Sequence, residues 1–140
     1  MRRAGIEVGC PPATALGIVL LVDGSPAARR VLADRLAAEG CAVREVGSVQ
    51  GGRGLDAAAL AGLACAVLDL ELSDGDGADL ATSLLAKRPS LPIAFFTNGA
   101  TPSLVESARA RGPVFLKPDL GSLIVWIKRA QRSTYPPPTK

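Results

Sequence analysis

The sequence contains no histidine, and this absence removes several kinds of chemistry at once. A serine or cysteine nucleophile activated by histidine is excluded, and so is a role as a phosphohistidine carrier. Most transition-metal centres are also excluded, because imidazole is the commonest side-chain ligand for such metals. Whatever chemistry the chain performs must be built from other side chains.

Aromatic residues and cysteines are also scarce. Aromatics make up 4% of the chain and apolar residues 48%, so we expect an aliphatic core with much alanine. The three cysteines are an odd number at scattered positions, which fits neither a disulfide framework nor a zinc site. Cys41 and Cys65 lie in apolar runs and are expected to be small core residues in a reducing compartment.

Long hydrophobic runs and strong charge are lacking too. No run approaches the roughly 20 apolar residues of a membrane helix, so we expect a cytoplasmic protein without membrane contact. The net charge of +3 is spread along the chain, whereas a nucleic-acid footprint needs clustered basic residues. A chain of 140 residues accommodates one domain. We expect a flexible leader at 1–16, a domain at 17–132 and a proline-containing tail at 133–140.

Short apolar segments alternate with helical patterns between residues 17 and 132. We expect helices from Pro26 to Gly40, over about 55–63, from the turn at 73–77 to Pro89, over 102–111 and over 120–132. In the first helix one stripe should face inward, formed by Ala28, Val31, Leu32 and Leu36. The glycine-rich stretch 47–54 is expected to be a loop. The five expected strands are 18–22, 41–46, 64–70, 91–96 and 114–116.

This alternation predicts an α/β fold, namely a doubly wound five-stranded parallel sheet with helices on both faces. The apolar runs lack the alternation of a half-exposed sheet, which is typical of strands buried on both faces. In such sheets, ligands bind in the crevice at the carboxyl ends of the strands. Functional side chains are therefore expected just after each strand.

Four polar residues stand at these expected strand ends: Asp23, Asp69, Thr97 and Lys117. If the first and third strands are neighbours, about 4.8 Å apart, the two aspartates converge. Two carboxylates that close are unfavourable unless a cation lies with them. Lys117 is one candidate for this cation, and a divalent metal such as Mg²⁺ is the other.

These segments together resemble the receiver domains of two-component response regulators, a family that includes the chemotaxis receiver. The resemblance covers residues 17–132 and implies a flavodoxin-like strand order 2-1-3-4-5. The matching segments are Ile18-Val-Leu-Leu-Val-Asp23, Ala66-Val-Leu-Asp69-Leu-Glu-Leu-Ser-Asp-Gly-Asp-Gly77, Phe95-Phe-Thr97 and Phe115-Leu-Lys117-Pro118. The most specific part of this pattern is the segment around Asp69 combined with the later Lys117-Pro118.

The resemblance implies a role for each strand-end residue. Asp69 matches the phosphoacceptor, which takes a phosphoryl group from the phosphohistidine of a kinase or phosphotransfer protein. Lys117 matches the lysine that pairs with the phosphoryl oxygens, and Thr97 matches the hydroxyl that hydrogen-bonds them. Asp23 matches one of two acidic Mg²⁺ ligands, Asp69 itself is a further ligand, and the backbone carbonyl of Glu71 falls at another ligand position. These residues can supply positioning and charge neutralisation without histidine.

The chain departs from the family pattern at three places. Gly24 replaces the second of two adjacent acidic residues, so Mg²⁺ binding is expected to be weakened. Val114 stands where the family places an aromatic, and Phe115 should face the other side of the sheet because strand side chains alternate. Asn98 follows Thr97 where the family favours a smaller residue, and should narrow access to the site.

Two functions from different classes follow from this reading. The first is a stand-alone receiver without enzyme activity, which takes a phosphoryl group on Asp69 and signals to a downstream protein by changing conformation. The second is a phosphorylation-independent binding or dimerisation module with the same fold, which Gly24 and Val114 favour; a homodimer is possible under either. A haloacid-dehalogenase-like phosphatase is disfavoured, because that family needs an aspartate where Glu71 stands.

Overall fold

The computed structural model describes residues 17–134, so the expected leader 1–16 and residues 135–140 of the expected tail lie outside the described residues. The main sheet has five parallel strands in the order β2-β1-β3-β6-β7, and a second, antiparallel pair is formed by β4 and β5. Counted along the chain, the main sheet has the order 2-1-3-4-5, which confirms the predicted fold class. The strands are β1 Ile18–Val22, β2 Ala42–Val46, β3 Leu63–Leu68, β4 Glu71–Leu72, β5 Gly75–Asp76, β6 Ile93–Thr97 and β7 Val114–Leu116.

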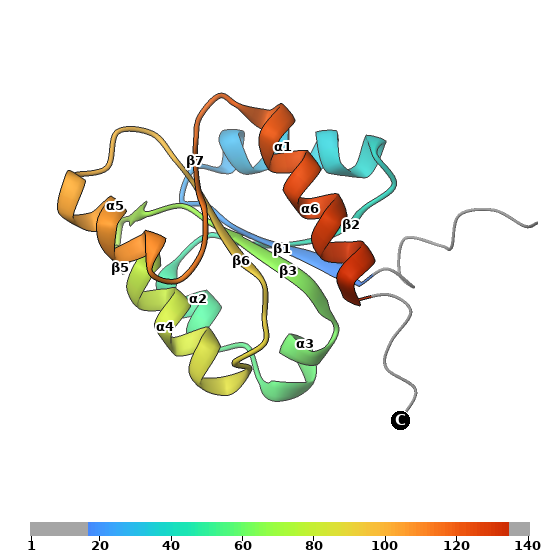
Figure 1. The fold of residues 1–140 in the computed structure, drawn as a ribbon, viewed down its shortest axis with the longest axis horizontal. Helices are drawn as coiled ribbons and strands as arrows, with labels where there is room; N and C mark the ends of the chain where they lie inside the picture. The colour runs from blue at the N-terminus through green and yellow to red at the C-terminus, as the bar shows by residue number, and fades with distance from the viewer. Residues whose placement is uncertain (1–16, 135–140) are drawn as a thin grey trace, which may run out of the picture.

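Helices cover both faces of this sheet. Helices α1 and α6 lie on one side, and α2, α3 and α4 lie on the other (Figure 1). Two separate cores result: one contains the inward side chains of α1 and α6, and the other contains those of α2 to α5. The helices are α1 Pro26–Ala38, α2 Val49–Arg53, α3 Ala57–Ala61, α4 Gly77–Lys87, α5 Pro102–Arg109 and α6 Leu120–Thr134.

The position of each strand in the sheet explains its sequence. β3 is paired on both edges and covered on both faces, and all six of its residues are buried. An unbroken apolar run is typical of a parallel strand that is buried on both faces of the sheet. β2 forms one edge, and there Arg44 and Glu45 are exposed. Cys41 and Cys65 are buried, as predicted, and burial raises the pKa of the Cys65 thiol to about 12.

Helix α1 begins at the predicted residue and ends at Ala38, two residues before Gly40, and the predicted inward position of Val31 is wrong. The Ser25 hydroxyl accepts a hydrogen bond from the Ala28 backbone N–H, and Pro26 occupies the first turn. The residues that pack on the sheet include Leu32 and Leu36, whereas Val31 is 62% exposed. Successive helical residues are turned by about 100°, so a stripe centred on Leu32 and Leu36 leaves Val31 at its margin.

The segment between β2 and β3 also differs from the prediction. Residues 47–54 are not simply a loop: they contain α2, capped by the Ser48 hydroxyl, which accepts from the Gly51 N–H. The predicted helix over 55–63 is shorter, because α3 spans Ala57–Ala61 and Leu63 already belongs to β3. A Cβ at position 52 would lie 2.8 Å from Leu80 Cδ2 of α4, so glycine at this position spares the Leu80 side chain a shift. The glycines therefore allow two helices to pack closely, a tertiary effect that outweighs their low helix propensity.

The chain after β3 forms more structure than the expected turn. β3 ends at Leu68, before the predicted Leu70, and the β4–β5 hairpin follows. Asp76 then caps α4 by accepting a hydrogen bond from the Asp79 N–H. Helix α6 continues to Thr134, two residues into the segment expected to be a tail. Within residues 17–134 no helix combines the length and the apolar character needed to cross a membrane.

Candidate functional site

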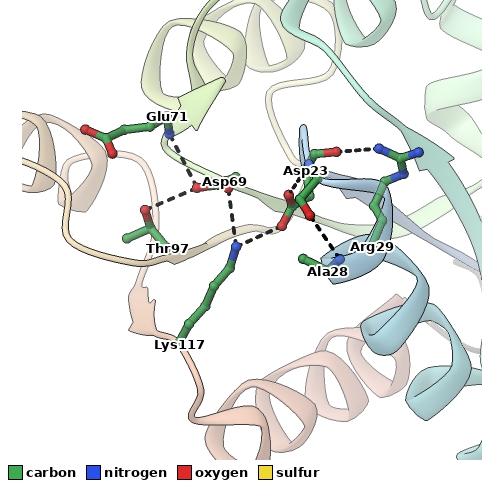
Figure 2. A network of polar contacts seen from close by, with 8 residues as sticks. Asp23, Ala28, Arg29, Asp69, Glu71, Thr97 and Lys117 are labelled. Atoms are coloured by element: carbon green, nitrogen blue, oxygen red, sulfur yellow. Dashed lines mark hydrogen bonds and ion pairs between the residues drawn. The ribbon is translucent and has the colours of Figure 1, made fainter. Parts of the chain in front are cut away.

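Four strands bring the predicted site residues together at the carboxyl end of the parallel sheet. Asp23 follows β1, Asp69 follows β3, Thr97 ends β6 and Lys117 follows β7. The parallel ladder continues past the strand ends: the Asp69 N–H donates to the Val22 carbonyl at 2.8 Å, and the Lys117 N–H donates to the Thr97 carbonyl at 2.8 Å. The backbone at each of these positions is therefore held by its neighbour, and the side chains converge (Figure 2).

The Lys117 ammonium lies between the two carboxylates. Its Nζ is 2.9 Å from Asp23 Oδ2 and 3.3 Å from Asp69 Oδ2, so one cation bridges both acids. The three side chains are mostly buried, with exposed fractions of 21% for Lys117, 14% for Asp23 and 13% for Asp69. The prediction that the two aspartates need a cation between them is met in this structure by the lysine.

The other oxygen of Asp69 is also occupied. Oδ1 accepts a hydrogen bond from the Thr97 hydroxyl at 3.2 Å and a longer one from the Glu71 backbone N–H at 3.4 Å. Thr97 is only 1% exposed, so its hydroxyl is a fixed donor beneath the carboxylate. These contacts place an ammonium, a hydroxyl and a backbone N–H around one carboxylate, an arrangement suited to receiving negative charge.

Asp23 is held by contacts that the sequence did not reveal. Its Oδ1 accepts from the Ser25 backbone N–H at 2.8 Å, and its backbone carbonyl accepts from Arg29 Nη1 at 2.6 Å. Arg29 also pairs with Glu45 of β2, with 3.3 Å between Nε and Oε1. The available signal was weak: an arginine in the first turns of a helix opposes the helix dipole and calls for a nearby acceptor.

Gly77 determines how closely α4 approaches the site. A Cβ at Gly77 would overlap the backbone carbonyl oxygen of Asp69, and its N–H donates to the Leu70 carbonyl at 2.9 Å. Only glycine can sit at this distance from the loop that carries the acceptor aspartate. Gly77 was assigned to a turn from the sequence, and this packing role was missed.

The departures from the family pattern have clear structural counterparts. Val114 packs against the core of α2 to α5 and Phe115 against the core of α1 and α6, which confirms that they face opposite sides of the sheet. The Lys117 ammonium lies 5.8 Å from the centre of the Phe96 ring, close enough for a cation–π contact. Asn98 is exposed next to Thr97.

The surroundings of Lys117 act on its pKa in opposite directions. Burial alone would lower it, because a charged ammonium is disfavoured away from water. The hydrogen bond that the ammonium donates to Asp23 and the charges of Asp69 and Asp23 together outweigh this effect, and the pKa of Lys117 is raised above its usual range. Lys117 therefore stays protonated at neutral pH and remains a full positive charge at the site.

A groove of about 220 Å³ opens beside Asp23 and Lys117. Its walls come from the first half of α1 and from the connection between β7 and α6. Val31, the exposed large apolar side chain of α1, is one of the lining residues. The lining residues are Asp23, Ala28, Val31, Leu32, Phe96, Lys117, Pro118 and Leu120.

The donor set for a divalent metal is smaller than the family's. Within residues 17–134, no group of three or more acidic, histidine or cysteine side chains is placed to hold a metal ion. Asp23 and Asp69 supply two carboxylates, and Mg²⁺ commonly binds to one or two carboxylates together with waters and substrate phosphates. The residues present therefore fit Mg²⁺, but they offer it fewer carboxylate ligands than the family pattern does. Glu71 brings its N–H to Asp69, and its carbonyl as a ligand stays a prediction.

Comparison with known proteins points in one direction. The family model described as "Response regulator receiver domain" matches residues 19–117, more than half of the chain. None of the curated proteins matches the chain significantly.

Several solved structures share the fold. A receiver domain protein from Clostridium thermocellum has a TM-score of 0.77 at 16% identity, covering 84% of this chain and 96% of that one. A two-component response regulator from Clostridium difficile has a TM-score of 0.73 at 21% identity, covering 85% and 98%. The non-phosphorylated HemR receiver domain from Leptospira biflexa has a TM-score of 0.73 at 24% identity, covering 89% and 99%. At sequence identities below 25%, these comparisons show that the chain shares the fold of those proteins.

Proposed function

Because the chain belongs to the response regulator receiver domain family, we propose that Asp69 accepts a phosphoryl group from the phosphohistidine of a histidine kinase or phosphotransfer protein. The observation that carries the proposal is the placement of three donors on one carboxylate. Lys117 Nζ lies 3.3 Å from Oδ2 of Asp69, and the Thr97 hydroxyl lies 3.2 Å from Oδ1. A purely structural aspartate would not need to meet side chains from two other strand ends.

The proposed transfer is a displacement at phosphorus. A carboxylate oxygen of Asp69 forms a bond to phosphorus, while the phosphorus–nitrogen bond of the donor phosphohistidine breaks. The electron pair of that bond returns to the imidazole, which takes up a proton from solvent. The product on this chain is an acyl phosphate, and the histidine is supplied by the partner, because this chain has none.

The chain's own residues neutralise the charge that arrives. Lys117 pairs with a phosphoryl oxygen, and the Thr97 hydroxyl donates a hydrogen bond to another. When bound, Mg²⁺ would supply further charge neutralisation, held by Asp23, Asp69 and the Glu71 carbonyl, and its binding should be weak because Gly24 lacks a carboxylate. Catalysis of this kind depends on positioning and electrostatics, which these side chains provide.

We propose that the signal leaves through a change in the loops after β3 and β6. Thr97 is directly bonded to the acceptor carboxylate, so a phosphoryl group there would draw it and the end of β6 toward the site. Leu116 at the end of β7 and Val125 on α6 are 60% and 55% exposed, and they offer apolar contacts to a downstream protein or a second copy of the chain. No enzymatic output is proposed for this domain.

The alternative is a phosphorylation-independent protein-binding or dimerisation module. Gly24 removes one carboxylate from the usual acidic pair, and Val114 leaves the usual aromatic position without a ring. Either change could uncouple the fold from phosphoryl transfer. The two functions differ in a single measurable property, which is whether Asp69 becomes modified.

Intact-mass spectrometry separates the two. The protein is incubated with Mg²⁺ and phosphoramidate or acetyl phosphate, beside Asp69→Ala and Thr97→Ala variants. We expect the wild type to gain one phosphoryl group, Asp69→Ala to gain none, and Thr97→Ala to be modified more slowly. Equal mass gain in the wild type and Asp69→Ala would reject Asp69 as the acceptor. No gain in any of the proteins would favour the binding module.

A further inference from the structure

We propose that one face of helix α4 is a docking surface for an acidic segment of a partner protein. The inference goes beyond the proposed function, because it holds whether or not Asp69 accepts a phosphoryl group, and its test needs no phosphoryl donor. We call this surface the α4 cation face and define it by the side chains of Arg53, Thr82, Ser83, Lys87 and Arg111.

Two arginines from neighbouring elements meet on the middle of α4, which packs against both α2 and α5 (Figure 1). Arg53, in the last turn of α2, donates from Nε to the Ser83 hydroxyl at 3.2 Å. Arg111, which follows α5, donates from Nε to the Thr82 hydroxyl at 2.7 Å. Since Thr82 and Ser83 are consecutive residues, two guanidinium groups are held on one short stretch of the helix.

A third cation lies one turn further along α4. The Lys87 ammonium donates to the backbone carbonyls of Arg53 and Leu55 at 2.6 and 2.9 Å, so it holds the end of α2 close to α4. Ser83 and Lys87 are four residues apart and share a side of the helix, which brings the charges of Arg53 and Lys87 near each other. Like charges that close are unfavourable unless an anion lies with them.

The described part of the chain supplies no such anion. None of the ion pairs within residues 17–134 involves Arg53, Lys87 or Arg111. The pKa of Asp74 is lowered mainly by hydrogen bonds from the Gln50 and Val49 N–H groups, and the charge of Arg53 makes the smallest contribution. The α4 cation face therefore keeps an excess of positive charge for a partner to neutralise.

The position of the two arginines is not explained by the helix dipole. A cation near the carboxyl end of a helix is stabilised by the dipole, which accounts for Lys87 in the last turn of α4. This effect falls off within one turn, and Thr82 and Ser83 lie in the middle of α4, which spans Gly77–Lys87. The arginines are held there by the two hydroxyls.

The remaining donors suit carboxylates. Each arginine is anchored through Nε, and the N–H groups on the Nη atoms of Arg53 make no hydrogen bond within residues 17–134. Arg111 uses only Nη1 in addition, on the Ser107 carbonyl at 2.8 Å and on the Ser107 hydroxyl at 3.5 Å. A guanidinium pairs with a carboxylate through two parallel hydrogen bonds, and a side chain that is already ordered loses less entropy on binding.

The pattern favours an acidic protein segment over a nucleic acid. A phosphate backbone carries closely and regularly spaced charges, so it calls for basic residues along a continuous stripe. The α4 cation face offers three cations, and the exposed Asp79 lies on the same helix about one turn before Thr82. A peptide with a few separated carboxylates can pair with the three cations and avoid Asp79.

The test uses fluorescence anisotropy with a labelled peptide of alanine and glutamate, about 15 residues long so that it can form a helix. A second peptide has glutamine in place of glutamate. The salt concentration is kept low, because salt screens exposed charges. The proteins are the full-length wild type and the double variants Arg53→Gln/Arg111→Gln and Arg129→Gln/Arg132→Gln. The second variant is the matched control, since it removes two exposed arginines from α6 and changes the net charge equally.

We expect Arg53→Gln/Arg111→Gln to bind the glutamate peptide on the order of tenfold more weakly than the wild type, and the control to stay within about twofold. Equal weakening in both double variants would show attraction by net charge alone and overturn the proposal. Equal binding of the glutamine peptide by the wild type would overturn it too. If the first variant does not fold, Arg53→Lys/Arg111→Lys replaces it. This variant keeps the charges without the paired donors and should bind several-fold more weakly, and unchanged binding would contradict the proposal.

Two other occupants are tested with the same proteins. Tighter binding of a DNA duplex than of the glutamate peptide, lost in Arg53→Gln/Arg111→Gln, would overturn the choice of a protein partner. Sedimentation that finds a wild-type dimer and a monomeric Arg53→Gln/Arg111→Gln variant would assign the surface to a second copy of the chain instead. Asp69→Ala should bind the peptide as the wild type does. Absence of phosphorylation therefore rejects only the proposed function, and absence of peptide binding rejects only this inference.

Discussion

Two regions of the molecule use charged side chains in different ways. At the site, the Lys117 ammonium faces the carboxylates of Asp23 and Asp69. Charges contact backbone groups instead in the region of α2, α3 and α4, on one face of the sheet. We call this region the α2–α4 seam and define it by the contacts of Asp74, Lys87 and Arg88 with the backbone of residues 49–63. Arg88 Nη1 donates to the carbonyls of Leu60 and Leu63 at 2.7 Å each.

The seam includes an anionic contact of the same kind. The Asp74 carboxylate accepts hydrogen bonds from the Val49 and Gln50 backbone N–H groups at 2.9 and 3.0 Å, and so ties the β4–β5 hairpin to the start of α2. Backbone partners carry no net charge, so these contacts offer no opposite charge that a metal or a phosphate could replace. Charge pairs, by contrast, can exchange one partner for a metal or a phosphate. The comparison predicts that the contacts of the seam stabilise the fold, whereas the ion pairs of the site can exchange one partner for a metal or a phosphate.

Arg88→Ala should give the largest loss of stability. It removes one charged donor that serves two part-buried carbonyls, which is expected to cost about 2 kcal/mol of unfolding free energy. Urea unfolding at pH 7 measures this, with the exposed Arg129 changed to alanine as the control. Phosphoryl incorporation and Mn²⁺ binding by the folded variant should stay unchanged. A loss below about 0.5 kcal/mol, the range of ordinary surface substitutions, would contradict the role of the seam.

Lys117→Met should have an intermediate effect that depends on pH. Removing the ammonium leaves two carboxylates together, at an expected cost of about 1 kcal/mol at pH 7, since the pair is partly exposed. The pKa of Lys117 is raised in the folded protein, so its contribution is complete below the unfolded-state pKa and is lost as pH rises through the folded-state pKa.

The difference in unfolding free energy between wild type and Lys117→Met should therefore be constant from pH 6 to 9 and shrink in more alkaline solution. Denaturant unfolding across this pH range measures it, and Lys87→Met is run in parallel. A difference that grows at high pH would have the wrong sign for a lysine stabilised by carboxylates.

Asp74→Asn should have the smallest effect. Hydrogen bonds from Gln50 and Val49 lower the pKa of Asp74, so its contribution is present above the unfolded-state pKa and is lost as pH falls through the folded-state pKa. The wild type should consequently lose its small advantage over Asp74→Asn below about pH 4. Acid unfolding followed by circular dichroism tests this. An advantage that persists at pH 2 would show that the negative charge is not what binds the two N–H groups.

Much of the fold was predictable because its signals are local. The bounds of β1 and β7 and the start of α1 follow from apolar runs and from Ser25-Pro26. The strand-end rule also identified Asp23, Asp69, Thr97 and Lys117, since residues at the carboxyl ends of parallel strands share one edge. Whether Asp69 carries the phosphoryl group and whether the Glu71 carbonyl binds metal stay predictions.

The misses share one cause, which is packing between elements distant in sequence. Gly52 was left outside the expected helices, yet it lies in α2, where the absence of a Cβ leaves room for the Leu80 side chain of α4. Val31 was placed in the core, yet it lines the groove beside the site. Arg29 received no role, and its partners, the Asp23 carbonyl and Glu45, come from two other elements. Local patterns carry no information about such partners.

The sequence by itself determined the five strands of the main sheet, the aliphatic core and the four polar residues at the strand ends, because each depends on periodicity or on neighbours along the chain. Only the tertiary structure showed that the Lys117 ammonium lies between the two aspartates. The sequence named lysine and a metal as candidates for this place, and the position of the lysine rests on distances of 2.9 and 3.3 Å between groups that are 94 and 48 residues apart. Electrostatic energies at such range depend on geometry that no local pattern contains.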